Sequence, residues 1–376
     1  MAGIYVHIPF CTQLCNYCDF HFSVSLKNKD QLMQALINEI ELQKDYLNGN
    51  TMETIYFGGG TPSILSQDEI NNIINKIYSI HQITDNPEIT FEANPDDLTK
   101  NYLLQLKNTP ITRLSIGIQS FFNTDLQFLN RRHNAIDTIN CIQNSQEVGF
   151  DNINIDLIYG IPGMGNTKWK SNLHKAFKLN IQHISAYHLS FEPKTVFSYY
   201  LKKGKIKPID EKDSVEQFKT LTRYMKKEGF IHYEISNFAK DGFFSKHNLN
   251  YWFQKKYLGI GPSAHSYNGL SRQWNVANNT RYIRALENNE QVFERETLNN
   301  LTKYNDYVLT SLRTMWGIDL KYLQDNFGMN ARNHCLKAAK KKLNNKYILL
   351  ANDKIFLSEK GKLIADNIIS ELFMIE

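Results

Sequence analysis

The chain has 376 residues and a net charge of +5, and 42% of its residues are hydrophobic while 22% are charged. This length allows two or three domains with a large core, and the composition is that of a soluble globular protein rather than a disordered or membrane-embedded one. We expect a cytoplasmic protein without a membrane span, because no apolar run approaches roughly 18 residues and the first ten residues do not read as a signal peptide.

A cluster of cysteines follows the first expected strand, Gly3–Pro9. Three of the five cysteines fall within eight residues, with the spacing C-x3-C-x2-C: Cys11, Cys15 and Cys18. An iron–sulfur cube normally takes four cysteine ligands, so three local ligands leave one iron open to a small molecule. The alternative is a zinc site that adds a histidine such as His7 or His21. We interpret Cys141 and Cys335 as buried small hydrophobes.

Strands and helices alternate through the first half of the chain. The remaining expected strands are Thr54–Phe57, Glu88–Ala93, Arg113–Gln119, Asn152–Tyr159 and His183–Phe191. The expected helices cover Lys29–Leu47, a segment that starts at Ser66 with Glu69 completing a capping box, Leu98–Leu106, Asp125–Leu129, Ala135–Val148 and Lys168–Leu179. Such alternation implies parallel strands, and six units are too few for an eight-fold barrel. We predict an α/β fold with a partial (β/α)6 barrel over residues 1–195, with a doubly wound sheet as the alternative.

The pattern changes after residue 195. Residues 196–300 predict a connecting α+β segment, with a helix at Ser214–Lys227, a strand at His232–Phe238, a Lys/Asn/aromatic stretch at Lys246–Tyr257, and a strand and loop at Tyr257–Tyr267. Residues 301–376 predict a winged-helix-like module with helices at Tyr304–Met315, Lys321–Phe327, Arg332–Leu343 and Lys360–Leu372 and a hairpin that turns at Asn352-Asp353. A winged helix serves nucleic-acid binding or plain packing, so the fold of this module does not decide its role.

Polar residues gather at the expected carboxyl ends of the strands, where ligands bind in parallel α/β folds. The second strand runs into Gly58-Gly59-Gly60-Thr61, whose backbone can approach a ligand closely. Glu92 and Asp156 are carboxylates within apolar runs and need partners. Gln119 ends the fourth strand, and Arg131 and Arg132 follow it as candidate clamps for a carboxylate.

Several motifs together resemble the oxygen-independent coproporphyrinogen III oxidase family of radical S-adenosylmethionine (SAM) proteins. They are the segments Tyr5–Cys11 and Tyr56–Ser63, Glu92-Ala93-Asn94-Pro95, Asp156–Pro162 and the cysteine spacing. The resemblance implies a [4Fe-4S] cluster on the three cysteines, with SAM chelated to the open iron. It also implies SAM contacts at Tyr5, Gly59, Gly60, Thr61, Glu92, Gln119, Arg131 and Asp156.

Two departures and one further motif indicate a branch of that family. The oxidases carry a fourth cysteine two residues after the third, and this position is Phe20 here; they also carry an N-terminal extension, whereas this chain begins almost at its first strand. His247-Asn-Leu-Asn-Tyr251-Trp252 resembles the H-N-x-x-Y-W motif of the heme chaperone branch. An imidazole can ligate heme iron and the two aromatic rings can stack on a porphyrin, although His247 can equally serve as a structural hydrogen-bonding residue.

The resemblance therefore predicts a heme chaperone that binds a [4Fe-4S] cluster, SAM and heme and hands heme to an apo-hemoprotein such as a respiratory cytochrome. Its contact with a membrane would be peripheral at most, and we expect no nucleic acid as a partner. The enzymatic alternative is a coproporphyrinogen III dehydrogenase that oxidises propionate side chains with a SAM-derived radical. A third hypothesis is a zinc-stabilised nucleic-acid-binding protein.

Overall fold

Six parallel strands form the centre of the computed structural model, which describes residues 1–375. They pair in chain order, β1 to β6, and their bounds are β1 (Ala2–Ile8), β2 (Met52–Gly59), β3 (Ile83–Ala93), β4 (Arg113–Gln119), β5 (Ile153–Tyr159) and β6 (His183–His188). In the sheet, β1 and β6 are not neighbours: β9 lies beside β1 and β8 beside β6. The α/β class is therefore confirmed, with a parallel run that is open, as in a partial barrel.

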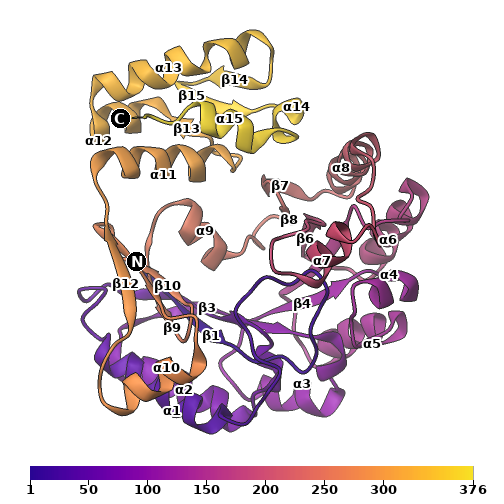
Figure 1. Cartoon of the computed structure of the whole chain (residues 1–376), viewed down its shortest axis with the longest axis vertical. Coiled ribbons are helices and arrows are strands. Elements are labelled where there is room, and N and C mark those ends of the chain that lie inside the picture. Colours follow the sequence, from indigo (N-terminus) through magenta and orange to yellow (C-terminus); the bar gives the residue numbers. More distant parts are fainter. Residues whose placement is uncertain (376) are drawn as a thin grey trace.

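Helices connect these strands and cover their outer face (Figure 1). They are α1 (Lys29–Leu42), α2 (Gln67–Ile80), α3 (Lys100–Lys107), α4 (Asn123–Phe128), α5 (Ala135–Glu147) and α6 (Asn166–Lys178), with short 3-10 turns η1 (Pro62–Ile64) and η2 (Pro95–Asp97). The capping box expected at Ser66 and Glu69 begins α2. The helix expected to reach Leu47 ends at Leu42, and β2 and β3 are longer than expected.

The two faces of the parallel strands bury different side chains. Because side chains alternate along a strand, residues two apart share a face. The outward residues are apolar and belong to the main hydrophobic core, as Ile89, Phe91 and Ala93 do on β3. The inward residues of the same strands are mostly polar: Thr54, Tyr56, Glu88, Thr90, Glu92, Arg113, Ser115, Asn154, Asp156, His183 and Ser185. The barrel interior is thus a polar column enclosed by an apolar shell.

The connecting segment extends the sheet at both edges. Its elements are α7 (Val196–Lys202), α8 (Glu211–Lys227), β7 (Ile231–Glu234), β8 (Asn237–Ala239), α9 (Lys246–Trp252), β9 (Lys256–Ile260), β10 (His265–Tyr267), β11 (Ser271–Asn275), α10 (Asn279–Glu287) and β12 (Phe293–Thr297). Strand β8 pairs antiparallel with β6, and β9 pairs parallel with β1. The single strand expected at His232–Phe238 is wrong, because two antiparallel strands, β7 and β8, occupy it.

The C-terminal module has its own hydrophobic cluster, built around Tyr304, Val308 and Leu323. Its elements are α11 (Asn300–Leu312), β13 (Ile318–Asp319), α12 (Leu320–Phe327), α13 (Met329–Asn344), β14 (Ile348–Ala351), β15 (Lys354–Leu357), α14 (Glu359–Lys362) and α15 (Ala365–Glu371). The hairpin turn at Asn352-Asp353 is confirmed, with both residues at positive φ. The last helix, expected to be continuous, is interrupted at Ile364, whose backbone is not helical.

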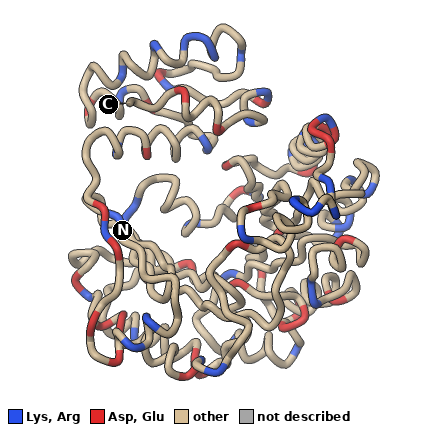
Figure 2. Tube along the Cα trace, viewed as in Figure 1, with Lys and Arg blue, Asp and Glu red and all other residues tan. Residues whose placement is uncertain are grey.

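Backbone hydrogen bonds join this module to the connecting segment. The Ile235 N–H donates to the Arg313 carbonyl at 3.1 Å, and the Met315 N–H donates to the Tyr233 carbonyl at 3.0 Å. Figure 1 shows α9 between α11 and the barrel, and Figure 2 shows charges of both signs interspersed over both parts. Within residues 1–375, none of the helices combines the length and apolar character needed to cross a bilayer.

One buried carboxylate ties α1 to the connecting segment. Glu39 is 2% exposed and accepts hydrogen bonds from the Gly261 N–H, the Asn275 side-chain amide and the Tyr282 hydroxyl. A buried carboxylate needs such donors, and the donors in turn need it. The contact between α1 and α10 therefore depends on one polar side chain as well as on apolar packing.

We expect Glu39→Ala to lower the free energy of unfolding by roughly 3 kcal/mol, because three buried donors lose their acceptor. Urea titrations followed by tryptophan fluorescence measure this change. Glu41→Ala, two residues along the same helix, removes only exposed ion pairs with Lys44 and Lys76 and should leave the free energy of unfolding close to that of the wild type. Equal effects of the two substitutions would contradict the structural role of Glu39.

Candidate functional site

A cavity of about 410 Å³ opens at the carboxyl ends of the parallel strands. This volume falls in the range of small-molecule sites, roughly 300–1,000 Å³. The cavity brings together ten of the residues singled out from the sequence: Cys11, Cys15, Cys18, Gly59, Gly60, Thr61, Glu92, Gln119, Arg131 and Asp156. They come from the cysteine loop, β2, β3, β4, β5 and the segment after α4, so the fold assembles residues that span about 145 positions of sequence.

Hydrogen bonds hold the cysteine loop, residues 9–23, in a closed form. The Ser23 N–H donates to the Pro9 carbonyl at 2.9 Å, and the Cys11 N–H donates to the Ser23 carbonyl at 3.0 Å. Asn16 donates to the carbonyl of Phe128, the last residue of α4, and accepts from the Phe197 N–H of α7. The loop is therefore anchored to two elements distant in sequence, which fixes the three thiols at the cavity wall.

The three thiols are half-buried and free of disulfides. Burial raises the pKa of Cys18 to about 12 and also raises the pKa of Cys11. Without a metal, Cys11 and Cys18 are therefore neutral thiols at physiological pH. Coordination to iron replaces the proton, because a metal-bound thiol is deprotonated.

Arg131 connects the cysteine loop to the floor of the cavity. Its Nη1 donates to the Cys15 sulfur at 3.3 Å, and its Nη2 donates to Asn94 Oδ1 and to the Gly117 carbonyl, both at 2.7 Å. Its Nε is buried and has no hydrogen-bond partner among the described residues. A buried donor without a partner at a cavity wall is suited to a ligand oxygen.

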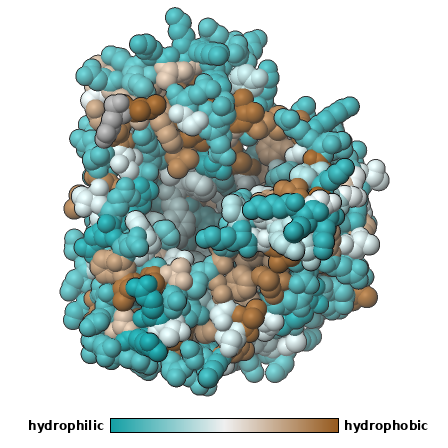
Figure 3. Space-filling model, viewed as in Figure 1, coloured by the Kyte–Doolittle hydropathy of each residue, from teal (hydrophilic) through white to brown (hydrophobic). Residues whose placement is uncertain are grey.

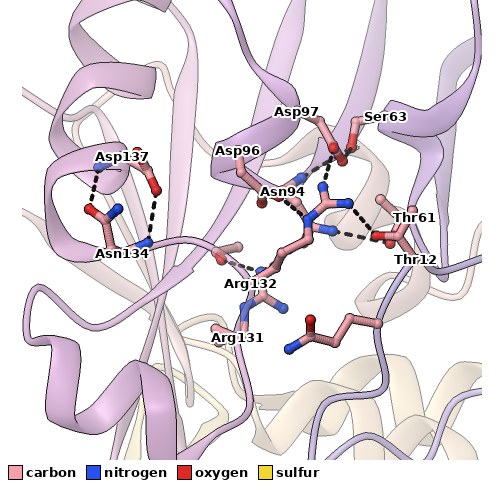
Figure 4. A network of polar contacts seen from close by, with 12 residues as sticks. Thr12, Thr61, Ser63, Asn94, Asp96, Asp97, Arg131, Arg132, Asn134 and Asp137 are labelled. Carbon is pink, nitrogen blue, oxygen red and sulfur yellow. Dashed lines mark hydrogen bonds and ion pairs between the residues drawn. The ribbon is translucent and has the colours of Figure 1, made fainter.

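Arg132 has a different environment, although it is the next residue. It forms ion pairs with Asp96 and Asp97 and donates to Thr12, as Figure 4 shows. Asp97 also accepts from the Ser63 hydroxyl at 2.7 Å. Arg132 thus fastens the cysteine loop to η2 and does not line the cavity, so of the two arginines only Arg131 is placed for a ligand.

Two carboxylates form part of the cavity floor. Glu92 accepts from the Tyr56 hydroxyl at 2.7 Å, and Asp156 accepts from the Asn154 amide at 2.9 Å. Burial raises the pKa of Glu92 to about 7 and also raises the pKa of Asp156. Each carboxylate lies in an apolar stretch of sequence and therefore needs a polar partner, which the structure supplies. Both carboxylates can accept further hydrogen bonds.

The backbone has a positive φ at Gln119, and at Gly59 and Gly60 it has a conformation or a close contact that requires glycine. Gln119 is buried at 7% exposure with a φ of +63°, and the register between β4 and β5 shifts just before it. Non-glycine residues at positive φ concentrate at functional sites. Gly59 has a φ of +110°, and a Cβ on Gly60 would lie 2.6 Å from the Phe10 carbonyl oxygen and 2.9 Å from the Cys11 sulfur. The glycines therefore allow β2 to end directly against the cysteine loop.

Tyr5 lies outside the lining of this cavity. Its hydroxyl is 3.1 Å from His7 Nδ1, and its ring packs against Tyr56 and His247 in the polar column. The cavity lining does not include it, so its predicted SAM contact stays a prediction. Its burial beside Glu92 raises its pKa well above the ordinary value, which keeps the phenol neutral.

The H-N-x-x-Y-W motif forms most of α9 and lies away from the cavity lining. His247 is 1% exposed; its Nδ1 is 2.8 Å from the Thr54 hydroxyl and its Nε2 is 2.9 Å from the Tyr251 hydroxyl. Burial lowers its pKa to about 3. Both ring nitrogens are engaged in this arrangement, so the predicted heme ligation by His247, Tyr251 and Trp252 stays a prediction that requires these bonds to break.

The zinc alternative gains no support from the geometry. Among residues 1–375, no group of three or more His, Cys, Asp or Glu side chains is arranged to hold a single metal ion. The two histidines considered as zinc ligands have other partners: His7 Nε2 lies 3.0 Å from the His21 carbonyl, and His21 Nε2 lies 2.7 Å from Asn279. The three cysteines therefore stay the predicted ligands of a cluster, with no histidine in the described part of the chain placed to complete a zinc site.

Sequence reasoning missed several residues of the site. Tyr17, Asn94, Tyr187 and His188 line the cavity, and Asn154 orients Asp156 from below. The place of Tyr17 between two cysteines and of Asn94 inside a motif could have identified those two residues. The others could not be found in this way, because their positions depend on how β5, β6 and the cysteine loop meet in space.

The chain resembles known proteins over nearly its whole length. The profile of the "Radical SAM superfamily" matches residues 5–176. "Heme chaperone HemW" of Bacillus subtilis is 31% identical over 98% of this chain and 98% of its own length, and "Heme chaperone HemW" of Escherichia coli is 34% identical over 70% and 69%. The crystallised coproporphyrinogen III oxidase HemN of Escherichia coli, a radical SAM enzyme, superposes with a TM-score of 0.86 over 99% of this chain and 90% of its own, at 23% identity, which speaks for the fold alone.

We expect Gly60→Ala to reduce the iron and sulfide that the protein retains after anaerobic reconstitution, because the new methyl group would displace the cysteine loop. Iron and sulfide assays, with circular dichroism to verify folding, measure the effect. Gly165→Ala is the matched control, since a Cβ there meets nothing within 4 Å and its φ of −70° suits alanine. Full cluster content in the Gly60 variant would show that the close approach is not required.

Proposed function

The chain belongs to the HemW family within the radical SAM superfamily, and we propose that it is a heme chaperone that holds a [4Fe-4S] cluster, SAM and heme and delivers heme to apo-proteins. The observation that carries the proposal is the cavity at the strand ends, which gathers three free thiols and seven polar or glycine residues of the resemblance around about 410 Å³. The acceptor we propose is an apo-hemoprotein such as a respiratory cytochrome, in the cytoplasm or at its membrane face.

Each part of the cavity has a role in this proposal. Cys11, Cys15 and Cys18 would hold the cluster, and Arg131 donates to one of the sulfurs and so stabilises its thiolate form. Gly59 and Gly60 allow close backbone approach, while Glu92 and Asp156 accept hydrogen bonds from ligand donors. When bound, SAM and the cluster would supply one-electron chemistry or a conformational signal for heme transfer.

Heme needs an apolar face and an axial donor, and two places supply them. One place is the cavity wall that holds the exposed Phe20 and Tyr187, with Phe20 68% exposed, together with His188. The other place is the hollow between the C-terminal module and the barrel (Figure 3), where α9 carries His247. The imidazole of His188 packs against Gly160 and the Tyr159 ring, whereas His247 would first have to leave Thr54 and Tyr251.

The dehydrogenase remains the competing function because it would use the same cavity. Phe20 argues against it, since the resemblance places a cysteine of the oxidases at this position. An open mouth is also unfavourable for radical oxidation, which requires the substrate to be enclosed away from water. The zinc-stabilised nucleic-acid-binding hypothesis loses its main premise, because the geometry offers no zinc site among the described residues.

We expect Cys15→Ser to abolish the brown cluster absorption, because a serine hydroxyl is a poor iron ligand at neutral pH, and Cys141→Ser to leave it intact. Cys141 is buried in α5, donates to the Thr138 carbonyl and does not line the cavity. Ultraviolet–visible spectra with iron and sulfide assays of anaerobic preparations measure this. A full complement of iron in the Cys15 variant would reject the ligand assignment.

We expect the anaerobic protein to give a heme Soret band and to produce no protoporphyrinogen from coproporphyrinogen III, SAM and reductant. Either His188→Ala or His247→Ala should shift the Soret band, according to which histidine is the axial donor. His174→Ala, on the exposed face of α6, should leave the band unchanged. If His247 is the donor, heme binding must free α9 from Thr54, so tryptic cleavage at Lys246 and Lys255 should rise with heme.

Each outcome separates the hypotheses. Product formed at a useful rate would establish the dehydrogenase. Heme binding that neither histidine affects would keep the chaperone and reject both donors. Neither heme binding nor product would leave the family assignment without the proposed function.

A further inference from the structure

Arg113 is a buried charge without a local partner. It begins β4, is 1% exposed and points into the polar column beneath the cavity. No carboxylate among the described residues lies within ion-pair distance of its guanidinium, and its buried Nε has no hydrogen-bond partner there. An arginine keeps its charge in proteins, and a buried charge is normally paired. A cation in this position therefore needs another source of compensation.

The carboxylates that face the polar column can compensate this charge: Glu92 and Asp156 at the cavity floor, and the buried Glu88, which also accepts hydrogen bonds from the Lys246 and His247 N–H groups. Arg113 pairs in register with Thr90 on β3, and Glu92 follows two residues later on the same inward face. Asp156 faces the same column from β5. The charge of Arg113 acts on Glu92 and Asp156 and opposes the effect of burial on their pKa values. Charges in a low-dielectric interior interact over distances at which surface charges do not.

We propose that Arg113 is a positioning residue of the SAM site: its charge favours the ionised forms of Glu92 and Asp156 against the effect of burial, so that a larger fraction of the protein can accept hydrogen bonds from a ligand that carries ammonium and hydroxyl groups. This inference rests on the proposed function, because it takes SAM to be the ligand of the cavity. Arg113 lies behind the cavity and does not touch that ligand. Arg113 is absent from the cavity lining, which is why it acts through the two carboxylates.

The groups around Glu92 determine how its ionisation responds to pH. Tyr5 faces it from β1, Tyr56 from β2, Asp156 from β5, Tyr187 from β6 and Tyr251 from α9. The tyrosines are neutral because their pKa values are raised, and Asp156 repels a second negative charge. Arg131 faces Asp156, and the neighbouring imidazoles of His183 and His247 have lowered pKa values and are neutral. Arg113 is thus the charge in this set that favours ionisation of Glu92.

The test is SAM affinity as a function of pH, measured by anaerobic calorimetry on cluster-loaded protein. In the wild type, affinity should fall as pH drops through the pKa of Glu92. In Arg113→Met the fall should move to higher pH by about one unit, with affinity about fivefold weaker near pH 7 and close to wild type at pH 9. Arg113→Lys restores a cation and should return the profile toward wild type.

Thr90→Val is the matched control, since it removes a buried hydroxyl without a partner from the same register position and changes no charge. Its pH profile should equal that of the wild type. Arg113→Gln, which keeps hydrogen-bonding atoms, takes the place of the methionine variant if that variant does not fold, and the same shift is expected. If the Arg113 variant lowers SAM affinity equally at every pH, or leaves it unchanged, the inference is overturned. The proposed function still stands in that case, because the wild-type protein binds SAM. Absence of SAM binding in the wild type overturns both.

Discussion

Each parallel strand buries apolar side chains on one face and polar side chains on the other, and the molecule depends on keeping the two apart. The outward residues pack beneath the surrounding helices and supply the hydrophobic stabilisation. The inward residues could not form an oil-like core, because glutamates, an arginine and histidines lie among them. Their burial is tolerated because each strand presents partners to the next, as Asn154 does to Asp156 and Tyr56 does to Glu92.

Helix α9 connects this polar column to the rest of the chain. The Glu88 carboxylate accepts hydrogen bonds from the Lys246 and His247 backbone N–H groups, and the Asn250 amide donates to the Thr54 hydroxyl. At its other end, Phe253 packs against Trp316 of the C-terminal module. The H-N-x-x-Y-W motif therefore has a structural role, because it joins the barrel to the C-terminal module. Heme ligation by His247 would alter the contacts that join them.

The cavity and the cysteine loop are coupled through Arg131. Its guanidinium contacts the Cys15 sulfur, Asn94 beside η2 and the backbone of β4. A displacement of the cysteine loop would therefore also shift groups at the cavity floor. Such a contact offers a physical route by which a cluster and a ligand could influence each other. It also explains why an arginine, with its rigid fork of donors, suits this position better than a lysine.

Local patterns in the sequence determined the alternating strands and helices, the capping box at Ser66, the turn at Asn352 and the proximity of the three cysteines, because each depends on residues a few positions apart. The motifs also indicated most of the cavity lining, since polar residues at the ends of parallel strands converge on one edge. Only the tertiary structure decided that α9 lies beneath the barrel with both nitrogens of His247 engaged, and that Tyr187 and His188 join the cavity mouth. It likewise revealed Arg113 as a buried cation, because burial and charge balance depend on residues that β-strand pairing brings together from distant parts of the chain.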